Sequence, residues 1–523
     1  MIRRQRIFQT CSVLLFIHLL VAAGSFTTDE YFLRRIIALD PAASLGTALA
    51  ARALFAGMAG ALVLLVLTLI FGRFFCGHIC PLGACIDLAD HLPRRQNRFL
   101  PKISLVRTGV FLILCGAACG GLSLLFAFAP LALSTRLVAL LGEPLLRLGA
   151  AFGVDFLRTL CDGGWLTFAH IRTPFYSPIL PLAIVTLMPF LGTLIARRFW
   201  CRAVCPAGAL FSCAAQRPAL TRQVAEKCIR CGRCRKACPT EAIGTDPRIT
   251  RHGECITCRH CAAVCPVHAI NFSFSLHQPA GSRCPDPGRR TLLVGGTAAL
   301  VGGGFLLSTT RVPEAADSVP LRPPGARPEI HFLRRCIGCG ACMAVCPTNT
   351  LQPSGFDGPW RALLSPLLTP AVGPCRTDCA RCGQFCPTAA ILPLTAEEKI
   401  WARPGSARID KKRCLAWQEE RACLVCDEVC PFAAIVLVRV PGIGNAVPEV
   451  ITNRCSGCGY CEHECPVAGT RAIVVNADGA LRLNDSNHRR EGLKSGLDIR
   501  LQAHEGYPGG TENHLGLPPG FTP

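Results

Sequence analysis

The spacing of the cysteines constrains this chain more than any other feature of its sequence. The chain contains 35 cysteines in 523 residues, and 24 of them fall into six groups of four. Four groups have the spacing Cys-x2-Cys-x2-Cys-x3-Cys, whereas the groups that begin at Cys375 and Cys414 have longer first gaps. Disulfide frameworks belong to short secreted chains with small cores. A chain of this length that is 50% hydrophobic is not of that class. The six groups are Cys228, Cys231, Cys234 and Cys238; Cys255, Cys258, Cys261 and Cys265; Cys336, Cys339, Cys342 and Cys346; Cys375, Cys379, Cys382 and Cys386; Cys414, Cys423, Cys426 and Cys430; and Cys455, Cys458, Cys461 and Cys465.

This spacing is typical of loops that hold [4Fe–4S] clusters in bacterial ferredoxins. In a ferredoxin with two clusters, three closely spaced thiolates bind one cluster and the fourth, before proline, binds the other. We therefore expect Cys265 to complete the cluster of the first group and Cys238 to complete that of the second. Paired zinc sites are the alternative, but they lack the third cysteine step and the Cys-Pro. The later groups predict four more clusters, six in all, and the spacing leaves open which of these groups exchange their fourth cysteine.

Long apolar runs predict a membrane part. Runs at about residues 8–24, 54–72, 108–133 and 177–196 are close to the ~20 residues that a helix needs to cross the bilayer. A fifth run, residues 291–307, is rich in glycine and follows Arg289-Arg290. The first run also allows a signal-peptidase site at residues 21–23. Arg289-Arg290 fits either a twin-arginine export signal or an ordinary basic flank.

Basic residues beside these runs predict their orientation. Arginines and lysines are enriched on the cytoplasmic side of membrane helices. They precede the first run, separate the second from the third, and follow the fourth. We therefore expect a bacterial inner-membrane protein whose first ferredoxin domain is cytoplasmic and whose C-terminal ferredoxin domain is periplasmic. The formal charge of +21 is then explained by the membrane, and no nucleic-acid partner is expected.

The expected fold is a membrane α-helical domain of four plus one transmembrane helices, joined to α+β domains of the bacterial ferredoxin type. Alternating composition along the chain sets the predicted boundaries. These are a polytopic membrane domain at 1–215, a cytoplasmic two-cluster ferredoxin domain at 216–285, a transmembrane or twin-arginine-like segment at 286–310, a linker at 311–330, a periplasmic four-cluster ferredoxin domain at 331–480, and a flexible tail at 481–523.

Two short cysteine motifs stand at the predicted cytoplasmic edge of the membrane. Cys76 and Cys80 follow the second apolar run, and Cys201 and Cys205 follow the fourth, each pair with three intervening residues and a proline after it. We take these four as the candidate catalytic residues. Three interpretations are open: the pairs supply four thiolates to one further site, act as redox-active dithiols, or are turn elements with incidental cysteines.

The arrangement of motifs resembles a known group of respiratory proteins. Residues 73–81 and 199–206, followed by a two-cluster ferredoxin, resemble NapH, the polytopic membrane ferredoxin of periplasmic nitrate-reductase systems. From Arg289 onward, the twin-arginine-like segment and the motifs at residues 336–342, 414–418 and 455–461 look like the NapG and MauM ferredoxins. The chain thus looks like a NapH–NapG fusion, and the fusion is the departure, because these proteins are usually separate.

The resemblance implies a quinol dehydrogenase component. Its membrane part would take electrons from membrane quinol, and its periplasmic part would pass them to a multihaem c-type cytochrome or a periplasmic reductase such as nitrate reductase. The sequence has no Cys-x-x-Cys-His haem site, no Walker loop and no G-x-S-x-G motif. The alternative is a maturation factor that reduces or protects a periplasmic metalloenzyme during assembly.

Overall fold

The computed structural model describes residues 2–24, 30–55, 57–90, 103–160, 173–275 and 319–501. The chain forms two compact units. The larger unit comprises Met1–Leu368 and Arg381–Pro393, and the smaller unit comprises Thr369–Ala380 and Leu394–Pro523. The fifth apolar run lies outside the described residues, and so does the C-terminal end of the predicted tail.

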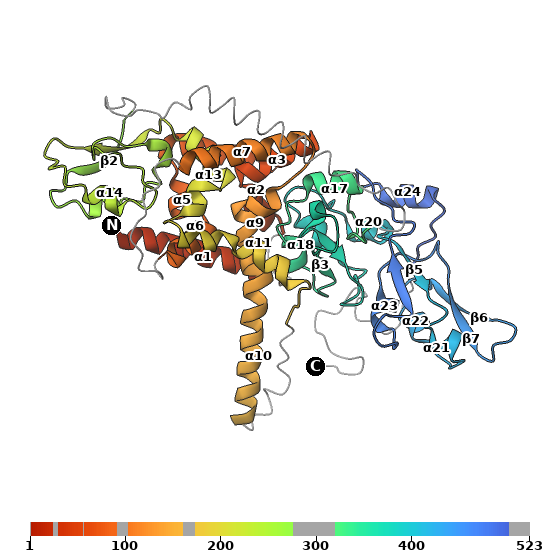
Figure 1. The fold of residues 1–523 in the computed structure, drawn as a ribbon. Helices are drawn as coiled ribbons and strands as arrows, with labels where there is room; N and C mark the ends of the chain where they lie inside the picture. The colour runs from red at the N-terminus through yellow and green to blue at the C-terminus, as the bar shows by residue number, and fades with distance from the viewer. Residues whose placement is uncertain are drawn as a thin grey trace, which may run out of the picture. The chain divides into compact units, whose positions relative to one another are not determined.

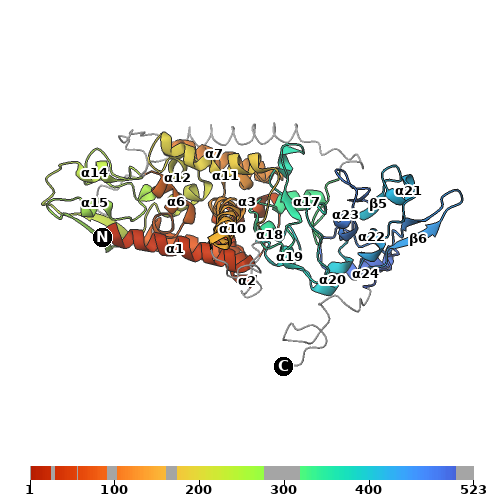
Figure 2. The same ribbon diagram turned by 90° about the horizontal axis from the view of Figure 1, so that it is seen from below.

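Helices form the body of the larger unit (Figures 1 and 2). They include α1 (Ile2–Gly24), α2 (Glu30–Ala38), α3 (Pro41–Ala51), α4 (Met58–Phe71), α7 (Ile103–Cys119), α8 (Leu125–Phe128), α9 (Pro130–Thr135), η1 (Arg136–Gly142), α10 (Glu143–Leu160) and α11 (Ile179–Leu191). Asp40 shows why α3 begins where it does. Its carboxylate accepts hydrogen bonds from the amides of Ala42 and Ala43, and Pro41 occupies the first helical position.

Two helices among the described residues are long and apolar enough to cross a membrane. They are Gln5–Ala23 and Pro130–Thr159, and only 17% of each apolar window is buried. Core helices and signal sequences can satisfy the same criteria of length and composition, so these two alone do not establish a membrane protein. Three other apolar helices, Met58–Phe71, Ile103–Cys119 and Ile179–Leu194, are shorter. The prediction of four plus one transmembrane helices is therefore not confirmed.

The third predicted run, residues 108–133, is not one helix. Helix α7 ends at Cys119, and Gly121 then adopts a φ of +83° in the turn that follows. A glycine takes this left-handed conformation without strain, whereas a helix cannot continue through it. The chain resumes as the short α8 and then as a continuous helical stretch from Pro130 onward. The long helix was hidden in the sequence because Arg136, Glu143 and Arg147 interrupt its hydrophobic run.

The two cysteine motifs lie in a structural repeat. In the first copy, α4 is followed by α5 (Phe74–His78) and α6 (Pro81–Ala89). In the second, α11 is followed by η3 (Gly192–Leu194), α12 (Phe199–Ala203) and α13 (Pro206–Ala214). Each copy is thus an apolar helix followed by a short helix and a second helix that begins with proline.

Two ferredoxin-like domains belong to the larger unit. In the first, β1 (Leu220–Val224) pairs antiparallel with β2 (Ile270–Phe274), and α14 (Arg233–Ala237), η4 (His252–Glu254) and α15 (His260–Ala263) lie between them in sequence. The second contains α17 (Glu329–Arg335), α18 (Ala341–Ala344), η6 (Trp360–Ala362), α19 (Arg381–Gln384) and the antiparallel pair β3 (Leu351–Pro353) and β4 (Pro366–Leu368). These domains agree with the predicted α+β ferredoxin class.

The smaller unit has a similar composition of short elements. Strands β5 (Ser406–Ile409) and β8 (Ile473–Asn476) pair antiparallel, and so do β6 (Ile435–Arg439) and β7 (Ala446–Val450). Its helices are α20 (Ala396–Trp401), α21 (Leu415–Gln418), α22 (Val425–Glu428), α23 (Tyr460–Glu464) and α24 (His488–Lys494). The predicted four-cluster domain of residues 331–480 is therefore divided between the two units.

Part of the predicted flexible tail is folded. Helix α24 packs against α20, and an added Cβ on Gly492 would lie 2.9 Å from the ring of Trp401. His488 and Ile499 are buried in the same region. The tail was predicted to be flexible because residues 484–523 are polar overall. The structure describes the segment up to residue 501, with Gly492 against Trp401 and with Leu497 and Ile499 buried.

Candidate functional site

The four regular cysteine groups fold into the same kind of loop. In each group, φ is positive at the second residue after the first cysteine and at the residue after the second cysteine. Only glycine adopts this conformation freely, and other residues do so where the surrounding structure imposes it. The residues are Arg230 and Gly232, Thr257 and Arg259, Gly338 and Gly340, and Gly457 and Gly459. The shared winding turns successive cysteines of a group toward one side of the loop.

Backbone amides are directed at the sulfur of the last cysteine of several groups. Cys238 accepts a hydrogen bond from the amide of Ala242 at 3.3 Å, and Cys265 accepts one from Ala269 at 3.3 Å. In the smaller unit, Cys430 accepts one from Ala434 at 3.4 Å. Hydrogen bonds to sulfur stabilise a thiolate and tune the potential of an iron–sulfur cluster. The fold of the loops alone thus places the sulfurs of Cys238, Cys265 and Cys430 as hydrogen-bond acceptors.

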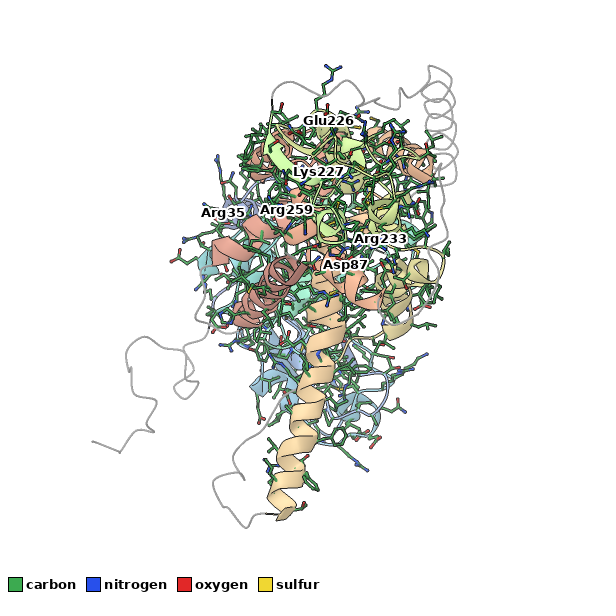
Figure 3. The ribbon with its side chains drawn as sticks, turned by 90° about the vertical axis from the view of Figure 1, so that its left-hand side faces the viewer. Arg35, Asp87, Glu226, Lys227, Arg233 and Arg259 are labelled. Atoms are coloured by element: carbon green, nitrogen blue, oxygen red, sulfur yellow. The ribbon has the colours of Figure 1, made fainter. Side chains whose placement is uncertain are left out.

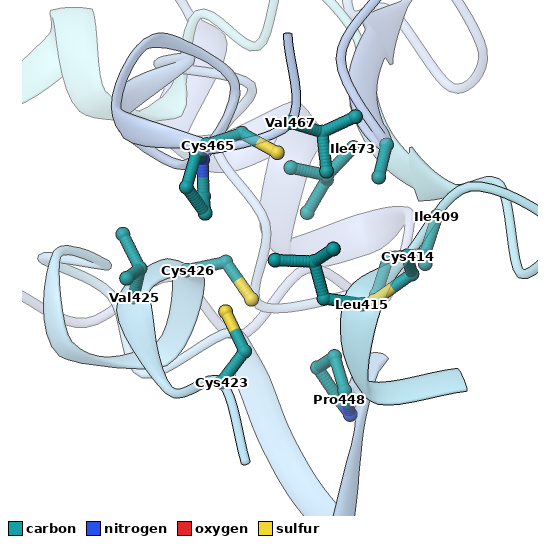
Figure 4. A pocket seen from close by; sticks show the side chains of 12 residues that line it. Ile409, Cys414, Leu415, Cys423, Val425, Cys426, Pro448, Cys465, Val467 and Ile473 are labelled. Carbon is teal, nitrogen blue, oxygen red and sulfur yellow. The ribbon is translucent and has the colours of Figure 1, made fainter. Parts of the chain in front are cut away.

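Three cavities reveal how the groups exchange cysteines. In the first ferredoxin domain, Cys238 lines a pocket together with three cysteines of the next group, Cys255, Cys258 and Cys261. In the smaller unit, Cys430 joins Cys455, Cys458 and Cys461 around a second pocket. Cys465 joins Cys414, Cys423 and Cys426 around a third pocket, as Figure 4 shows. Each set takes three cysteines from one group and the last from its partner.

The groups that begin at Cys414 and Cys455 therefore exchange their last cysteines, Cys430 and Cys465. The sequence left this pairing open. The groups that begin at Cys336 and Cys375 also exchange at least one cysteine. Cys386, the last of the second group, lies near Cys336, Cys339 and Cys342 of the first in the second ferredoxin domain. Of the remaining cysteines in the later groups, Cys375 and Cys379 belong to the smaller unit, and Cys346 and Cys382 to the larger.

The other set of the first ferredoxin domain is also brought together. Cys234 lies near Cys228 and Cys231. Cys265 packs in the same apolar cluster as Cys234.

The donor chemistry of these sets suits iron–sulfur clusters. Each cavity is lined by four cysteines, with mostly apolar side chains around the two in the smaller unit and with Arg222 and Arg259 among the lining of the first ferredoxin domain. Thiolates are the ligands that such clusters take. Burial raises the pKa of Cys255 and Cys426 to about 12. These thiols stay protonated without a metal, so cluster binding must release their protons. Among the described residues, no group of three or more His, Cys, Asp or Glu could hold a single metal ion. A four-iron cluster does not need such convergence, because each thiolate binds a different iron.

The structure brings the two membrane-edge motifs together. Cys80 and Cys205 are buried in one apolar cluster, and Cys76 and Cys201 pack against it. Cys80 caps α6, because its sulfur accepts a hydrogen bond from the amide of Gly83 at 3.4 Å. Cys205 caps α13 through Gly208 at 3.3 Å. We call Cys76, Cys80, Cys201 and Cys205 the paired-motif cysteines.

Their environment bears on the three interpretations of these motifs. Burial, followed by the nearby Cys76 and Asp87, raises the pKa of Cys201 to about 11, although Arg198 and Arg73 lower it. Redox-active dithiols need an accessible thiolate, so this burial disfavours the dithiol interpretation. The capping contacts support the turn interpretation for Cys80 and Cys205 only, because Cys76 and Cys201 lie inside α5 and α12.

Two buried arginines accompany the paired-motif cysteines, and the sequence reasoning did not single them out. Arg73 is 1% exposed and Arg198 is 0% exposed. Arg198 donates to the carbonyl oxygen of Cys76 at 2.9 Å and forms an ion pair with Asp87 at 2.5 Å. Arg73 lies beside Gly208 of the second motif. Each arginine thus reaches the opposite motif. A signal for them was present, because each stands three residues before the first cysteine of its own motif.

The first motif also contacts the first ferredoxin domain. Glu254, next to Cys255, pairs with Arg73 at 3.1 Å and with Arg107 of α7 at 2.6 Å. Burial raises the pKa of Glu254, but the charges of Arg107 and Arg73 outweigh it and hold the pKa below its usual value. Gly77 lies against the backbone of Ile256 with no room for a side chain. The loop that carries Cys255 and Cys258 is therefore held against the paired-motif cysteines.

Three family models match the chain. A model described as a 4Fe-4S binding domain matches residues 53–98 and 178–222, the two copies that hold the paired-motif cysteines. Models described as 4Fe-4S dicluster domains match residues 227–269 and 335–391. The chain therefore contains several domains of 4Fe–4S type, as the cysteine spacing predicts, although the matches do not fix the number of clusters.

Ferredoxin-type proteins are among the similar curated proteins. The methylamine utilization ferredoxin-type protein MauM of Methylorubrum extorquens is 33% identical over 204 residues, which are 36% of this chain and 89% of that protein. The ferredoxin-type protein NapG of Escherichia coli is 34% identical over 196 residues, 35% of this chain and 82% of that protein. The ferredoxin-type protein NapF of the same organism is 32% identical over 162 residues, 30% of this chain and 87% of that protein. The NapG and MauM part of the predicted resemblance is confirmed, and the NapH part stays a prediction.

Proposed function

Because over part of its length this chain belongs to the family of ferredoxin-type proteins that includes MauM and NapG, we propose that it carries electrons from membrane quinol to a periplasmic acceptor. It acts as a quinol dehydrogenase component with six [4Fe–4S] clusters, held by the 24 cysteines of the six groups. The acceptor is a multihaem c-type cytochrome or a periplasmic reductase such as nitrate reductase.

One observation carries this proposal: α1 contacts the first membrane-edge motif, which itself contacts the first ferredoxin domain, at one end and the second ferredoxin domain at the other. At the N-terminal end, Gln5 and Gln9 donate to the carbonyl oxygen of Gly77, beside the first ferredoxin domain. At the C-terminal end, the carbonyl oxygen of Ala23 accepts a hydrogen bond from Arg381 of the second. From Gln5 to Ala23 a helix rises about 27 Å, close to the ~30 Å thickness of the hydrocarbon core of a bilayer.

The outer surface of the helical body supports a membrane location. Phe8 and Leu15 of α1 are exposed, and so are Leu146, Phe152 and Phe156 of α10. Contiguous exposed apolar surface of this kind is rare on soluble proteins and marks contact with lipid or a partner. In the proposed orientation, these helices lie in the inner membrane.

The charge of the first ferredoxin domain supports its cytoplasmic orientation. Lys227, Arg233 and Arg259 are exposed on it, together with the acidic Glu226, and Figure 3 shows this end of the larger unit. Basic residues are retained on the cytoplasmic side of the membrane. We therefore propose that residues 216–275 are cytoplasmic and that the ferredoxin domains after residue 319 are periplasmic.

The residues of the chain serve this relay in three ways. Four cysteines per set hold each cluster, and apolar side chains such as Ile243 and Ile256 exclude water from the sulfurs. Backbone amides, such as that of Ala242, stabilise the sulfur charge. When bound, the clusters supply one-electron redox centres that connect a two-electron donor such as quinol to a one-electron acceptor.

The test is turnover with purified protein. Given a quinol analogue and a multihaem cytochrome, the protein is expected to reduce the cytochrome at a rate that depends on quinol. The proposal fails if the iron-loaded protein is inactive in this assay while its deletion leaves a periplasmic reductase without metal. That combination would establish the maturation role instead.

A further inference from the structure

We propose that residues 226–236 of the first ferredoxin domain form a docking surface for a small acidic ferredoxin. The docked ferredoxin gives one electron to the cluster held by Cys228, Cys231, Cys234 and Cys265. The chain then has a second electron entrance besides quinol. Docking is independent of quinol oxidation, and only the cytoplasmic location of the partner and the path of the electron beyond this domain rest on the proposed function.

The first support is that this loop is open where equivalent loops are covered. Cys231, the second cysteine of its group, is exposed, whereas Cys339, at the same position of its own group, is buried. A Cβ on Gly232 would meet no atom of the described residues within 4 Å. At the equivalent glycines of two other groups, a Cβ would lie 2.6 Å from Leu140 or 2.3 Å from Pro370. The fold therefore leaves the loop at Cys231 accessible to a second protein.

The second support is a concentration of positive charge in this loop. Residues 226–236 contain five lysines and arginines and one acidic residue. The same positions of the other three regular groups contain at most two lysines and arginines, in residues 253–263, 334–344 and 453–463. Each of these loops carries the same cysteine spacing and so would hold a cluster of the same charge. Balancing the charge of the cluster therefore does not explain the five basic residues.

The exposed basic side chains surround an apolar contact point. Lys227, Arg230 and Arg233 are exposed, and Ile229 among them is 60% exposed. Figure 3 shows Lys227 and Arg233 at this end of the larger unit. A charged rim around an apolar centre is a usual composition for a protein interface, and a complementary charge on the partner steers the encounter. The partner that fits is therefore a carrier with acidic residues around its own redox centre.

Acidic residues elsewhere in the domain do not cancel this charge. Glu241 forms an ion pair with Arg202 of α12 at 2.6 Å, and Glu254 forms one with Arg73 at 3.1 Å. The carboxylates of Glu241 and Glu254 are thus paired with arginines of the helical body. The positive charge of residues 226–236 remains available to attract an acidic partner.

The position of this set of cysteines suits an entrance. The other set of the domain lies beside the helical body, because Gly77 touches Ile256, between Cys255 and Cys258. Cys234 and Cys261 pack in one apolar core, so the two sets are adjacent. An electron received at the open loop can therefore pass to the set beside the helical body. The ferredoxin loses one electron and the [4Fe–4S] cluster gains it, and no bond or proton is exchanged.

Anaerobic rapid-freeze electron paramagnetic resonance of the full-length, iron-loaded protein tests this inference. The probe is a reduced acidic [2Fe–2S] ferredoxin, without quinol or cytochrome. Its signal should disappear as the signal of a reduced [4Fe–4S] cluster appears. The rate should fall as salt is added, because salt screens exposed charges. A reaction that does not occur, or whose rate is independent of salt, would overturn the proposal.

Two triple variants test the surface itself. At low ionic strength, the rate should fall about tenfold when the basic residues of the loop are removed, because steering raises association rates by at least that factor. This variant is Lys227→Gln/Arg230→Gln/Arg233→Gln. The control removes three exposed basic residues of the smaller unit and should react as the wild type does: Arg489→Gln/Arg490→Gln/Lys494→Gln. Equal rates in the two triple variants would contradict docking at residues 226–236.

A single variant covers a triple variant that loads less iron. Ile229→Glu keeps every basic residue of the loop and places a carboxylate at the apolar contact point. It should also slow the reaction with ferredoxin, and its iron content should equal that of the wild type. A wild-type rate in Ile229→Glu at full iron content would show that the partner does not contact this loop.

Anionic lipid is the competing partner for a basic surface. Hydrogen exchange of residues 226–236 should slow when oxidised ferredoxin is added to the protein in phosphatidylcholine nanodiscs. Slower exchange with phosphatidylglycerol in the nanodiscs, and no change with ferredoxin, would assign the loop to the membrane and overturn the proposal. None of these measurements needs quinol, so a protein that fails to oxidise quinol can still accept electrons from ferredoxin.

Discussion

Gly77 and Ile256 meet so closely that a Cβ on Gly77 would overlap the carbonyl oxygen of Ile256. This contact joins the first membrane-edge motif to the loop between Cys255 and Cys258. Because the obstructing atom belongs to the backbone, a flexible side chain cannot move aside to relieve the overlap.

Gly77→Ala should therefore weaken the attachment of the first ferredoxin domain. Overpacking of this kind costs about 1–3 kcal/mol. The variant should lose its iron chromophore at a lower temperature and expose residues 216–275 to proteases. Gly149→Ala is the control, because a Cβ on Gly149 in α10 meets nothing within 4 Å. Equal stability of the two variants would contradict the contact.

Glu254→Gln should detach the same loop for an electrostatic reason. The variant leaves Arg73 and Arg107, which are 1% and 2% exposed, without their shared carboxylate. Removing one partner of a buried pair costs about 3–5 kcal/mol. Asp155→Asn breaks the exposed pair with Arg158 and should change stability by about 0.5 kcal/mol or less. Thermal unfolding in detergent, followed by loss of cluster absorbance, measures both changes.

The packing of α24 should depend on pH through His488. Burial lowers the pKa of His488, although the carboxylates of Glu398 and Asp485 oppose the shift. A histidine with a lowered pKa in the folded state stabilises the fold above its unfolded pKa of about 6.5, and that stability is lost as the pH falls. The amide protection of residues 488–499 should thus be lower at pH 5.5 than at pH 7.5.

His488→Phe should abolish this pH dependence, because phenylalanine fills the buried space without a group that titrates. Arg489→Gln, at the exposed neighbouring position, should retain it. Protection factors corrected for intrinsic exchange provide the measurement. If residues 488–499 of the wild-type protein are unprotected at both pH values, the packing of α24 is contradicted and the predicted flexible tail is supported.

Reporter fusions test the proposed orientation. An alkaline phosphatase fused after Asp478 should be active, because that position is proposed to be periplasmic. The same enzyme fused after Phe272 should be inactive, whereas a cytoplasmic fluorescent reporter there should be bright. Activity at both positions would place the first ferredoxin domain outside the cytoplasm and remove the basis for the proposed electron path.

Local spacing made the cluster loops predictable. Cys336, Cys339 and Cys342 fall within seven consecutive residues, and a proline follows Cys346 at the end of the loop. The conformation of such a loop depends on residues close in sequence, so the spacing alone predicts it. The exchange between later groups was not predictable, because it depends on which strands pair. Strand β5 pairs with β8, about 65 residues later in the chain, and this long-range pairing leaves no trace in the cysteine spacing.

Other features were hidden because they depend on tertiary contacts. Arg73 and Arg198 looked like flanking positive charges, the usual role of arginine beside an apolar run. Their burial arises only when the two copies of the repeat meet and carboxylates from Asp87 and Glu254 reach them. The fold of residues 488–499 was similarly concealed, since α24 packs against α20, where Gly492 lies against the ring of Trp401.

The contacts of α1 have a consequence for the order in which the protein assembles. Helix α1 is synthesised well before its partner at the C-terminal end, because the carbonyl oxygen of Ala23 meets a donor from Arg381, 358 residues later. Its other end meets Gly77 much earlier in synthesis. One end of α1 can therefore be held early in synthesis, whereas the other end is held only after Arg381 has been made. If a peptidase removed α1 as a leader, the first membrane-edge motif and the second ferredoxin domain would both lose a contact.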